Sequence, residues 1–393
     1  MMISTFLLYL SVPASCVSAF AIPPSSSRHV SNTAIFAGGF GAKSKSAPKK
    51  KANNKRTKTK SSILSDIEDN KAPAAPSTPK LDRFGLPIPT EDDIFPPLTD
   101  DVIRTPATND EFKREEVADA IKNHIGVNLD MFDEDGYSIH EELSADGDSS
   151  SRWKLKLLHQ DPPVLSVENF FSESEVETYK SMIESNEGNS AGDNGAVQMS
   201  SPTFSASLSL SRRTSTTWFC MYESVTCLLA KAQALLNVET SQMEEPQLVR
   251  YRTGEEFSWH YDEIPAAQLS NGEQRLATLL VYLNDLEDGR GGGTVFRDLQ
   301  SPINSSNKRK KRSSPDSELT VRPKSGTALI FFPAFKDGTP DQRTLHKGEV
   351  ALDTKMIAQL WIHEKEYKAS VPNNNLQVDA AAGVKEKLEQ LGI

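Results

Sequence analysis

The sequence predicts a mainly β protein with flanking helices, in which two antiparallel sheets form a double-stranded β-helix (jelly roll) core behind a disordered N-terminal extension. Three observations support this fold class. Short apolar segments rich in strand-forming residues succeed one another from Gln247 onward, and most are too close together for parallel crossovers. Two segments with helical signals precede them. The first 150 residues lack any sustained hydrophobic period and have few aromatic residues.

The N-terminus has the features of a two-part targeting sequence. A short apolar segment followed by small residues predicts a signal peptide over residues 1–19. Residues 20–62 begin with Phe20 and form a transit-peptide-like basic segment without acidic residues. This arrangement resembles the presequences of algae with secondary plastids, so we expect a plastid protein. The alternative is the secretory pathway or endoplasmic reticulum, with an ordinary signal followed by a disordered basic linker.

The remainder of the chain is strongly acidic. The first 60 residues hold ten of the 44 Lys and Arg and no Asp or Glu, which leaves 34 basic against 54 acidic residues, or −20, downstream. Such a body argues against nucleic-acid binding, which needs a basic face. Three cysteines are too few for a disulfide scaffold, and past residue 20 no apolar run is long enough to span a membrane.

The composition divides the rest of the chain into three parts. Residues 63–150 are expected to form a mostly disordered acidic linker with one short helix near residues 110–124. Residues 151–368 are expected to form the catalytic domain, and residues 369–393 a C-terminal tail with a short helix. Alternating apolar residues predict strands over Trp153–Leu158 and Pro163–Val167 at the start of the domain.

Two helices follow these strands. Ser172 and Glu175 have the spacing of a capping box, and the periodic apolar residues of Met221–Leu236 predict a second helix that includes Cys227, with Cys220 just before it. Further strands are predicted over Gln247–Arg252, Leu276–Leu283, Gly293–Phe296, Leu319–Arg322, Gly326–Phe332 and Met356–Ile362. Residues 301–318 form a polar insertion loop. Its basic run, Lys308–Arg312, is either a solvated loop or a nuclear-import signal.

A metal site is predicted where His260 and Asp262 stand two residues apart. On an extended segment both side chains point to the same face. A second histidine on another strand would complete a two-His-one-carboxylate triad, which typically holds Fe(II) with open coordination positions. His346 precedes a strand late in the β-rich region and is the candidate. His363 is expected near the solvent-facing end of its strand.

Lys355 follows nine residues after His346, at the start of an apolar strand. If its ammonium is buried, it needs an anionic partner, which a carboxylate-bearing cosubstrate would provide. The alternative is an exposed strand end.

With these residues, the segment from about Pro163 to Lys365 resembles the catalytic domain of prolyl 4-hydroxylase alpha-subunit-like Fe(II)/2-oxoglutarate-dependent dioxygenases. The matching segments occur in family order: Asn169–Phe171 with Ser172 and Glu175, Arg213–Ser215 with Trp218, Gln247–Tyr251 with Gly254, Arg275–Thr278 through Tyr282–Asp285, Gly292–Phe296, Pro323–Phe332, and Trp361–Ile362.

The resemblance implies three iron ligands, which also form the catalytic centre: His260, Asp262 and His346. It implies that Lys355 pairs with the distal carboxylate of 2-oxoglutarate, and that Tyr251 and Thr294 hydrogen-bond this cosubstrate. A core tyrosine and a β-turn threonine remain the alternatives for the last two. The implied reaction is hydroxylation of a protein side chain, most often 4-hydroxylation of peptidyl-proline, with O2 consumed, succinate and CO2 released, and L-ascorbate as auxiliary reductant.

The sequence departs from the family pattern around the substrate. Thr354 stands where relatives often have Gly, Phe257 where several have Tyr, and Gly293 where many have an acidic residue. These differences leave open a related oxygenase with another substrate. A catalytically idle peptide-binding relative and a nuclear protein directed by Lys308–Arg312 are the further alternatives. The sequence identifies neither the hydroxylated residue nor the oligomeric state.

Overall fold

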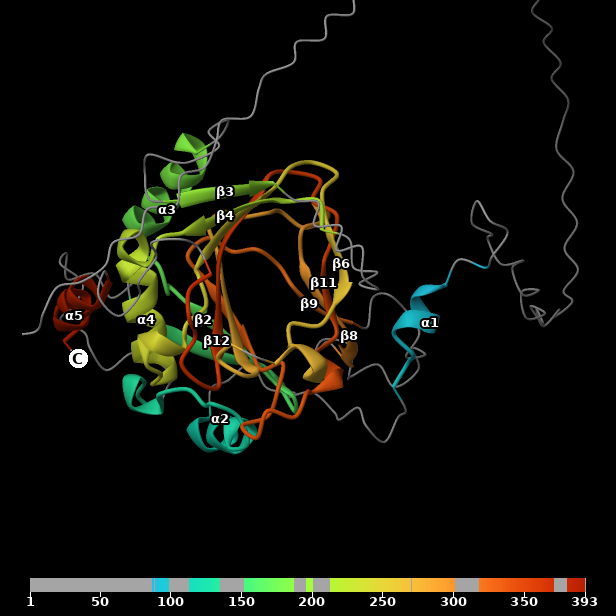
Figure 1. Cartoon of the computed structure of the whole chain (residues 1–393), viewed down its shortest axis with the longest axis horizontal. Helices are drawn as coiled ribbons and strands as arrows, with labels where there is room; N and C mark the ends of the chain where they lie inside the picture. The colour runs from blue at the N-terminus through green and yellow to red at the C-terminus, as the bar shows by residue number, and fades with distance from the viewer. Residues whose placement is uncertain are drawn as a thin grey trace, which may run out of the picture. The chain divides into compact units, whose positions relative to one another are not determined.

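Two antiparallel sheets lie at the centre of the computed structural model (Figure 1). The structure describes residues 87, 89–98, 113–134, 152–186, 196–200, 213–269, 271–300, 318–370 and 380–392, all of which belong to one unit, Thr78–Ile393. The large sheet has the order β1-β2-β10-β7-β12-β5-β4-β3, and the small sheet β6-β11-β8-β9. This arrangement confirms the predicted double-stranded β-helix core.

The bounds of eight strands follow the predicted segments closely, whereas no strand bounds were predicted for β3, β4, β6 and β11. The large sheet contains β1 (Lys154–Gln160), β2 (Pro163–Glu168), β3 (Ala196–Ser200), β4 (Thr216–Cys220), β5 (Gln247–Tyr251), β7 (Arg275–Tyr282), β10 (Ala328–Phe331) and β12 (Lys355–His363). The small sheet contains β6 (Phe257–His260), β8 (Thr294–Gln300), β9 (Glu318–Val321) and β11 (His346–Gly348).

The large sheet is buried on both faces. Its strand β7 reads as a nearly continuous apolar run because alternate residues enter two different cores. Leu279 and Val281 pack toward the helices, whereas Leu280 and Tyr282 pack into the space between the sheets. The second core also receives Phe296 from the small sheet.

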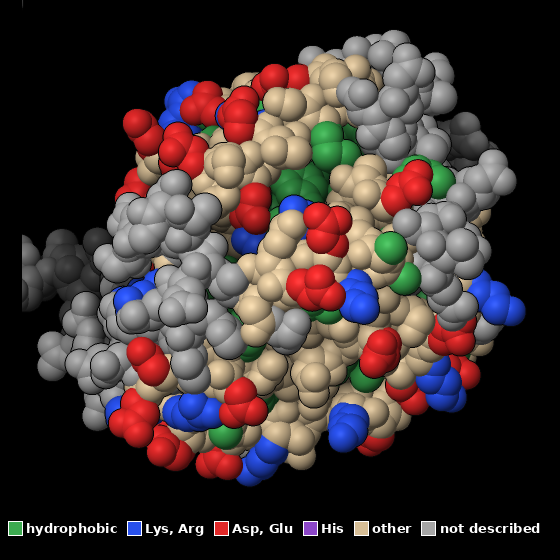
Figure 2. Space-filling model, turned by 90° about the vertical axis from the view of Figure 1, so that its left-hand side faces the viewer, with side chains coloured by type: hydrophobic (Ala, Val, Ile, Leu, Met, Phe, Trp, Pro, Cys, Tyr) green, Lys and Arg blue, Asp and Glu red, His purple; other side chains and the backbone are tan. Residues whose placement is uncertain are grey.

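Helices cover the outer face of the large sheet (Figure 1). Their bounds are α2 (Arg114–Ile121), α3 (Glu173–Ser185), α4 (Thr226–Leu236) and α5 (Ala381–Gln390), with short 3-10 turns at η1 (Leu129–Met131), η4 (Tyr222–Val225) and η5 (Thr240–Gln242). The predicted capping box of α3 is present: the Ser172 hydroxyl accepts from the backbone N–H of Glu175, and the Glu175 carboxylate accepts from that of Ser172. Figure 2 views the molecule from this side, where acidic and basic side chains intermingle and hydrophobic ones form small separate areas.

Residues 113–134 are folded, although they lie within the segment that was expected to be a mostly disordered linker with one short helix. The predicted short helix is present as α2, but the segment also contributes Val117, Ile121 and Phe132 to the core beneath the large sheet. Phe132 is fully buried. The apolar side chains of this segment are therefore sufficient to anchor it on the core.

A second upstream segment, residues 89–98 with the short helix α1 (Glu91–Ile94), packs on the outer face of the small sheet. The Phe95 ring lies against Trp259 on β6, Val295 on β8 and Leu345 just before β11. The Arg297 guanidinium fixes the segment by donating to the main-chain carbonyls of Phe95 (2.5 Å) and Pro96 (3.2 Å).

One local expectation was wrong. His363 is fully buried, because β12 continues its pairing with β7 to the end and Gly272 packs directly on the imidazole. Cys220 is the last residue of β4 and Cys227 lies on α4, and neither forms a disulfide within the described residues.

Several predictions fall outside the described residues: the signal peptide, the transit-peptide-like segment and nearly all of the insertion loop with its basic run. Among the described residues, no helix is both long enough and apolar enough to cross a bilayer.

Candidate metal centre

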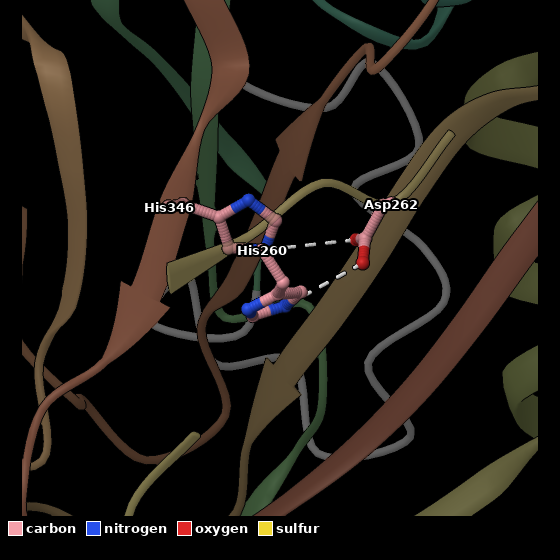
Figure 3. Close-up of side chains that lie close together, drawn as sticks. All are labelled: His260, Asp262 and His346. Atoms are coloured by element: carbon pink, nitrogen blue, oxygen red, sulfur yellow. Dashed lines mark ion pairs between the residues drawn. The ribbon is translucent and has the colours of Figure 1, made fainter. Parts of the chain in front are cut away.

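Two histidines and an aspartate meet between the sheets (Figure 3). Strands β6 and β11 are neighbours, and their register places His346 opposite His260. Asp262 follows two residues after His260, and its carboxylate lies 3.6 Å from Nε2 of His260 and 3.7 Å from Nε2 of His346. All three are buried, with their ligand atoms within 4.8 Å of one another. In the described part of the chain no other such cluster of His, Cys, Asp or Glu occurs.

A main-chain carbonyl two residues upstream orients each imidazole. Nδ1 of His260 donates to the carbonyl oxygen of Ser258 at 2.7 Å, and Nδ1 of His346 donates to that of Thr344 at 2.9 Å. Because a carbonyl can only accept, these bonds place the proton on Nδ1. The Nε2 lone pair of each ring is therefore available on the side that faces Asp262.

The surroundings favour a neutral His260 imidazole beside an ionised Asp262 carboxylate. Burial, reinforced by the adjacent His346, lowers the pKa of His260 to about 3. Burial alone would raise the pKa of Asp262, but the two histidines and a 2.7 Å hydrogen bond from Thr278 hold it below its ordinary value. This is the protonation state that metal binding requires.

The donor set fits a divalent iron. Two imidazole nitrogens and one carboxylate form the facial triad typical of non-haem Fe(II) oxygenases, which leaves coordination positions open for other ligands. The large aromatic rings beside the triad help to keep the space dry. Phe257 stacks on His260 with ring centroids 3.5 Å apart, and Phe331 lies edge-on to His346 at 4.7 Å.

Lys355 is buried at the start of β12 rather than exposed, which excludes the alternative of an exposed strand end. Its Nζ lies 5.3 Å from the ring centroid of Tyr251 and 5.7 Å from that of Tyr282. The Lys355 ammonium also lies beside β11, the strand of His346. A Cβ atom added to Gly348 on that strand would be 4.0 Å from Nζ.

Within the described residues Lys355 has no ion-pair or hydrogen-bond partner. Burial lowers its pKa to about 7, against a small raising effect of Glu349, which is paired with Arg322. A buried ammonium without an anion is unfavourable, and an incoming carboxylate would relieve this cost.

Tyr251 and Thr294 both lie close to this lysine. Tyr251 is buried and stands opposite Lys355 in the pairing of β5 with β12. Thr294 is buried at the start of β8, where its hydroxyl forms a 2.9 Å hydrogen bond with the Tyr282 hydroxyl. The structure thus brings all six predicted site residues between the sheets, although Thr294 already has a hydroxyl partner.

Sequence reasoning missed the residues that support the triad. Thr278 bonds the Asp262 carboxylate, and Arg275 donates to the Asp262 carbonyl oxygen at 3.3 Å. Arg275 in turn forms two 2.8 Å bonds with Glu244, which also bonds Nε2 of His363 at 2.9 Å. Residues three apart on one strand point to opposite faces, so the spacing of Arg275 and Thr278 gave no signal for a common partner at Asp262.

Comparisons with known proteins agree with this geometry. Residues 246–363 match the model of the 2OG-Fe(II) oxygenase superfamily. The chain is 33% identical over 138 residues to probable prolyl 4-hydroxylase 4 of Arabidopsis thaliana, covering 34% of this chain and 46% of that protein. It is 28% identical over 218 residues to prolyl 4-hydroxylase 2 of the same plant, covering 53% and 70%.

Among solved structures, the chain is similar to the viral collagen prolyl hydroxylase of Paramecium Bursaria Chlorella virus-1 in its 2OG complex. The identity is 25%, the match covers 51% of this chain and 94% of that chain, and the TM-score is 0.35.

The fold and the buried triad define a jelly-roll protein with an iron-type facial site. The domain that carries this site, matched over residues 246–363, belongs to the 2OG-Fe(II) oxygenase superfamily, with prolyl 4-hydroxylase-like relatives. The chain spans about half the length of the first of the curated relatives it matches.

Proposed function

We propose that this protein is an Fe(II)- and 2-oxoglutarate-dependent dioxygenase that hydroxylates a protein side chain, with peptidyl-proline as the foremost candidate. The observation that carries the proposal is the pairing of two features in one buried space. A complete His-Asp-His triad faces the interior, and a buried lysine without an anionic partner lies beside the same strands.

In this proposal His260, Asp262 and His346 hold Fe(II) through two Nε2 atoms and the carboxylate. Bound there together with 2-oxoglutarate, the iron would supply the O2 activation that hydroxylates an unactivated carbon, with succinate and CO2 released. The protein orients both imidazoles through carbonyl hydrogen bonds, keeps the carboxylate ionised through Thr278, and shields the site with Phe257.

Lys355 would anchor the distal carboxylate of 2-oxoglutarate. Its charge matches the cosubstrate, and its burial between Tyr251 and Tyr282 makes the attraction stronger than at a surface. Tyr251 and Thr294 would line the same pocket. The Thr294 hydroxyl is already hydrogen-bonded to the Tyr282 hydroxyl. We therefore expect the hydroxyls of Thr294 and Tyr282 to contact the cosubstrate as a pair.

The choice of proline rests on the relatives, several of which are named prolyl 4-hydroxylases. Phe257, Gly293 and Thr354 depart from the family pattern, so a related oxygenase with another substrate is the second candidate. A catalytically idle peptide-binding relative fits less well, because such a protein has no need of an intact triad or of an unpaired buried lysine.

We further propose L-ascorbate as auxiliary reductant and O2 as the second substrate.

A peptide assay tests the substrate. The full chain, Fe(II), 2-oxoglutarate and ascorbate are incubated with proline-containing peptides and with matched peptides in which alanine replaces proline. We expect the mass of one oxygen atom to be added to proline, and none with the alanine peptides. Succinate formation without modification of any proline peptide would point to the second candidate.

The place of action is a separate proposal. We propose import into a plastid through residues 1–19 and 20–62, with the secretory pathway as the alternative. Fusion of residues 1–62 to a fluorescent reporter distinguishes the plastid, secretory and nuclear fates. A reporter in the endoplasmic reticulum or the nucleus would contradict plastid import.

A further inference from the structure

The turn before β11 is held by a buried arginine. The 3-10 turn η9 (Gln342–Thr344) begins after Asp341, whose carboxylate accepts from the backbone N–H of Arg343 at 3.1 Å. The Arg343 side chain forks onto the same carboxylate through Nε (2.7 Å) and a terminal nitrogen (2.6 Å). Only 9% of the Arg343 side chain and 2% of the Asp341 side chain are exposed, so these bonds are shielded from water.

The other terminal nitrogen of Arg343 reaches a different part of the chain. It donates at 2.7 Å to Asp161, which lies in the turn between β1 and β2, 182 residues away in sequence. The neighbouring Pro162 carbonyl accepts from Nδ1 of buried His159 at 2.7 Å, which anchors the turn from the strand side. Arg343 therefore ties η9 to the edge region of the large sheet.

The tied turn leads directly to an iron-ligand candidate. The main-chain carbonyl of Asp341 accepts from both the N–H (3.1 Å) and the hydroxyl (2.8 Å) of Thr344. The Thr344 carbonyl then accepts from Nδ1 of His346. A continuous series of short contacts thus connects Asp161, through Arg343 and Asp341, to the imidazole.

The two histidines differ in how their carbonyl partners are held. The carbonyl that orients His260 belongs to Ser258 within β6, which pairs with β11 on one side. The carbonyl that orients His346 belongs to Thr344, which lies outside any strand. Its position depends on the turn, which is held by main-chain bonds from Asp341 to Pro333 and from Arg297 to Leu345 and by the side-chain bonds of Asp341 and Arg343.

We propose that Asp161, Arg343 and Asp341 form a clamp that positions the His346 imidazole for metal binding. This inference rests on the proposed iron site. The three residues are positioning residues, because they act through the Thr344 carbonyl and do not contact the metal-binding atoms. Loss of the clamp should let the carbonyl and the ring shift, which weakens the metal site while the fold is retained.

Titration of the metal-free full chain with Co(II) tests the clamp, since the visible absorption of bound Co(II) reports both affinity and ligand geometry. Asp161→Asn removes the negative charge from one tie and leaves the fork between Arg343 and Asp341, so this variant should fold. Arg343→Lys keeps the charge but loses the fork. We expect each to weaken Co(II) binding by roughly 10- to 100-fold and to alter the spectrum at saturation.

The matched control is Arg114→Lys. Arg114 also bonds an aspartate, Asp130 at 3.0 Å, and a main-chain carbonyl, that of Phe132 at 2.9 Å, but it lies on α2. Its replacement should lower the thermal midpoint of the metal-free chain without changing Co(II) affinity. The effects of Asp161→Asn and Arg343→Lys together should be less than additive, because both break the same tie.

The outcomes separate the clamp from the iron site. Weaker Co(II) binding with a changed spectrum in both variants, and not in the control, supports the clamp. Parent-like Co(II) affinity and spectrum in Asp161→Asn and Arg343→Lys, whatever their thermal midpoints, would overturn it. Failure of the parent chain to bind Co(II) would contradict the proposed iron site, and the clamp with it.

Discussion

Lys355 is the residue whose protonation depends most on what binds beside it. Burial between Tyr251 and Tyr282 lowers its pKa from 10.5 to about 7, and the nearest charged groups, Glu349 and Arg322, are paired with each other. A carboxylate next to Nζ would raise this pKa again. The complex would then hold a proton that the free protein loses as the pH rises above about 7.

We therefore expect the affinity for 2-oxoglutarate to fall about tenfold per pH unit above this value and to level off below it. Calorimetric titration with the Mn(II)-loaded chain, in buffers of different ionisation enthalpy, measures both the affinity and the proton uptake. Lys355→Arg stays charged and should show no uptake. Lys355→Ala should mainly raise the concentration of 2-oxoglutarate required. Binding without proton uptake by the parent above neutral pH would contradict this account of Lys355.

Thr278 supports the carboxylate of the triad. Replacing it with valine removes the 2.7 Å hydrogen bond to Asp262 while keeping the shape, so Co(II) affinity should fall by about 10-fold or more. The control is Thr217→Val on β4, because the buried Thr217 hydroxyl has no hydrogen-bond partner within the described structure. An unchanged affinity in Thr278→Val would show that Asp262 does not need this donor.

The metal ligands could be predicted from the sequence, but their supports could not. His260 and Asp262 are two residues apart on a strand, so their common face follows from backbone geometry alone. Thr278 bonds Asp262, which is 16 positions away in the sequence. Arg343 bonds Asp161, which is 182 positions away. Such partners depend on tertiary packing, which leaves no local period in the sequence.

Among the elements, the segment around α2 contributes more to the fold than its composition indicates. Phe132 is fully buried against the helix-side core, so Phe132→Ala should lower the free energy of unfolding by about 3–5 kcal/mol. Asp119→Ala on the exposed face of α2 should change it by less than about 0.5 kcal/mol. Denaturant titration measures both. Equal effects of the two variants would show that the segment is not part of the core.

Strands and capped helices were predictable, because each leaves a local pattern. The capping box of Ser172 and Glu175 and the apolar run of β7 are examples. The helix α2 was predicted, but the attachment of residues 89–98 and 113–134 to the domain was not, since it depends on a surface that the rest of the chain builds. The burial of His363 likewise depends on Gly272, far away in sequence.

At the scale of the whole molecule, the folded domain begins upstream of residue 151. A chain that begins at residue 87 retains every contact described here, whereas one that begins at residue 151 loses Val117, Ile121 and Phe132 from the core. The longer chain should unfold at a clearly higher temperature, and the shorter one should expose apolar surface and aggregate. Identical thermal midpoints would place the domain boundary at residue 151 after all.

We propose that one buried site both holds iron and consumes 2-oxoglutarate. The most direct measurement is succinate formation from 2-oxoglutarate by the purified full chain, with and without Fe(II), beside the His260→Ala variant. We expect succinate from the parent only when Fe(II) is present, and none from His260→Ala, which lacks one of the three triad ligands. Equal succinate formation by the variant and the parent would contradict it.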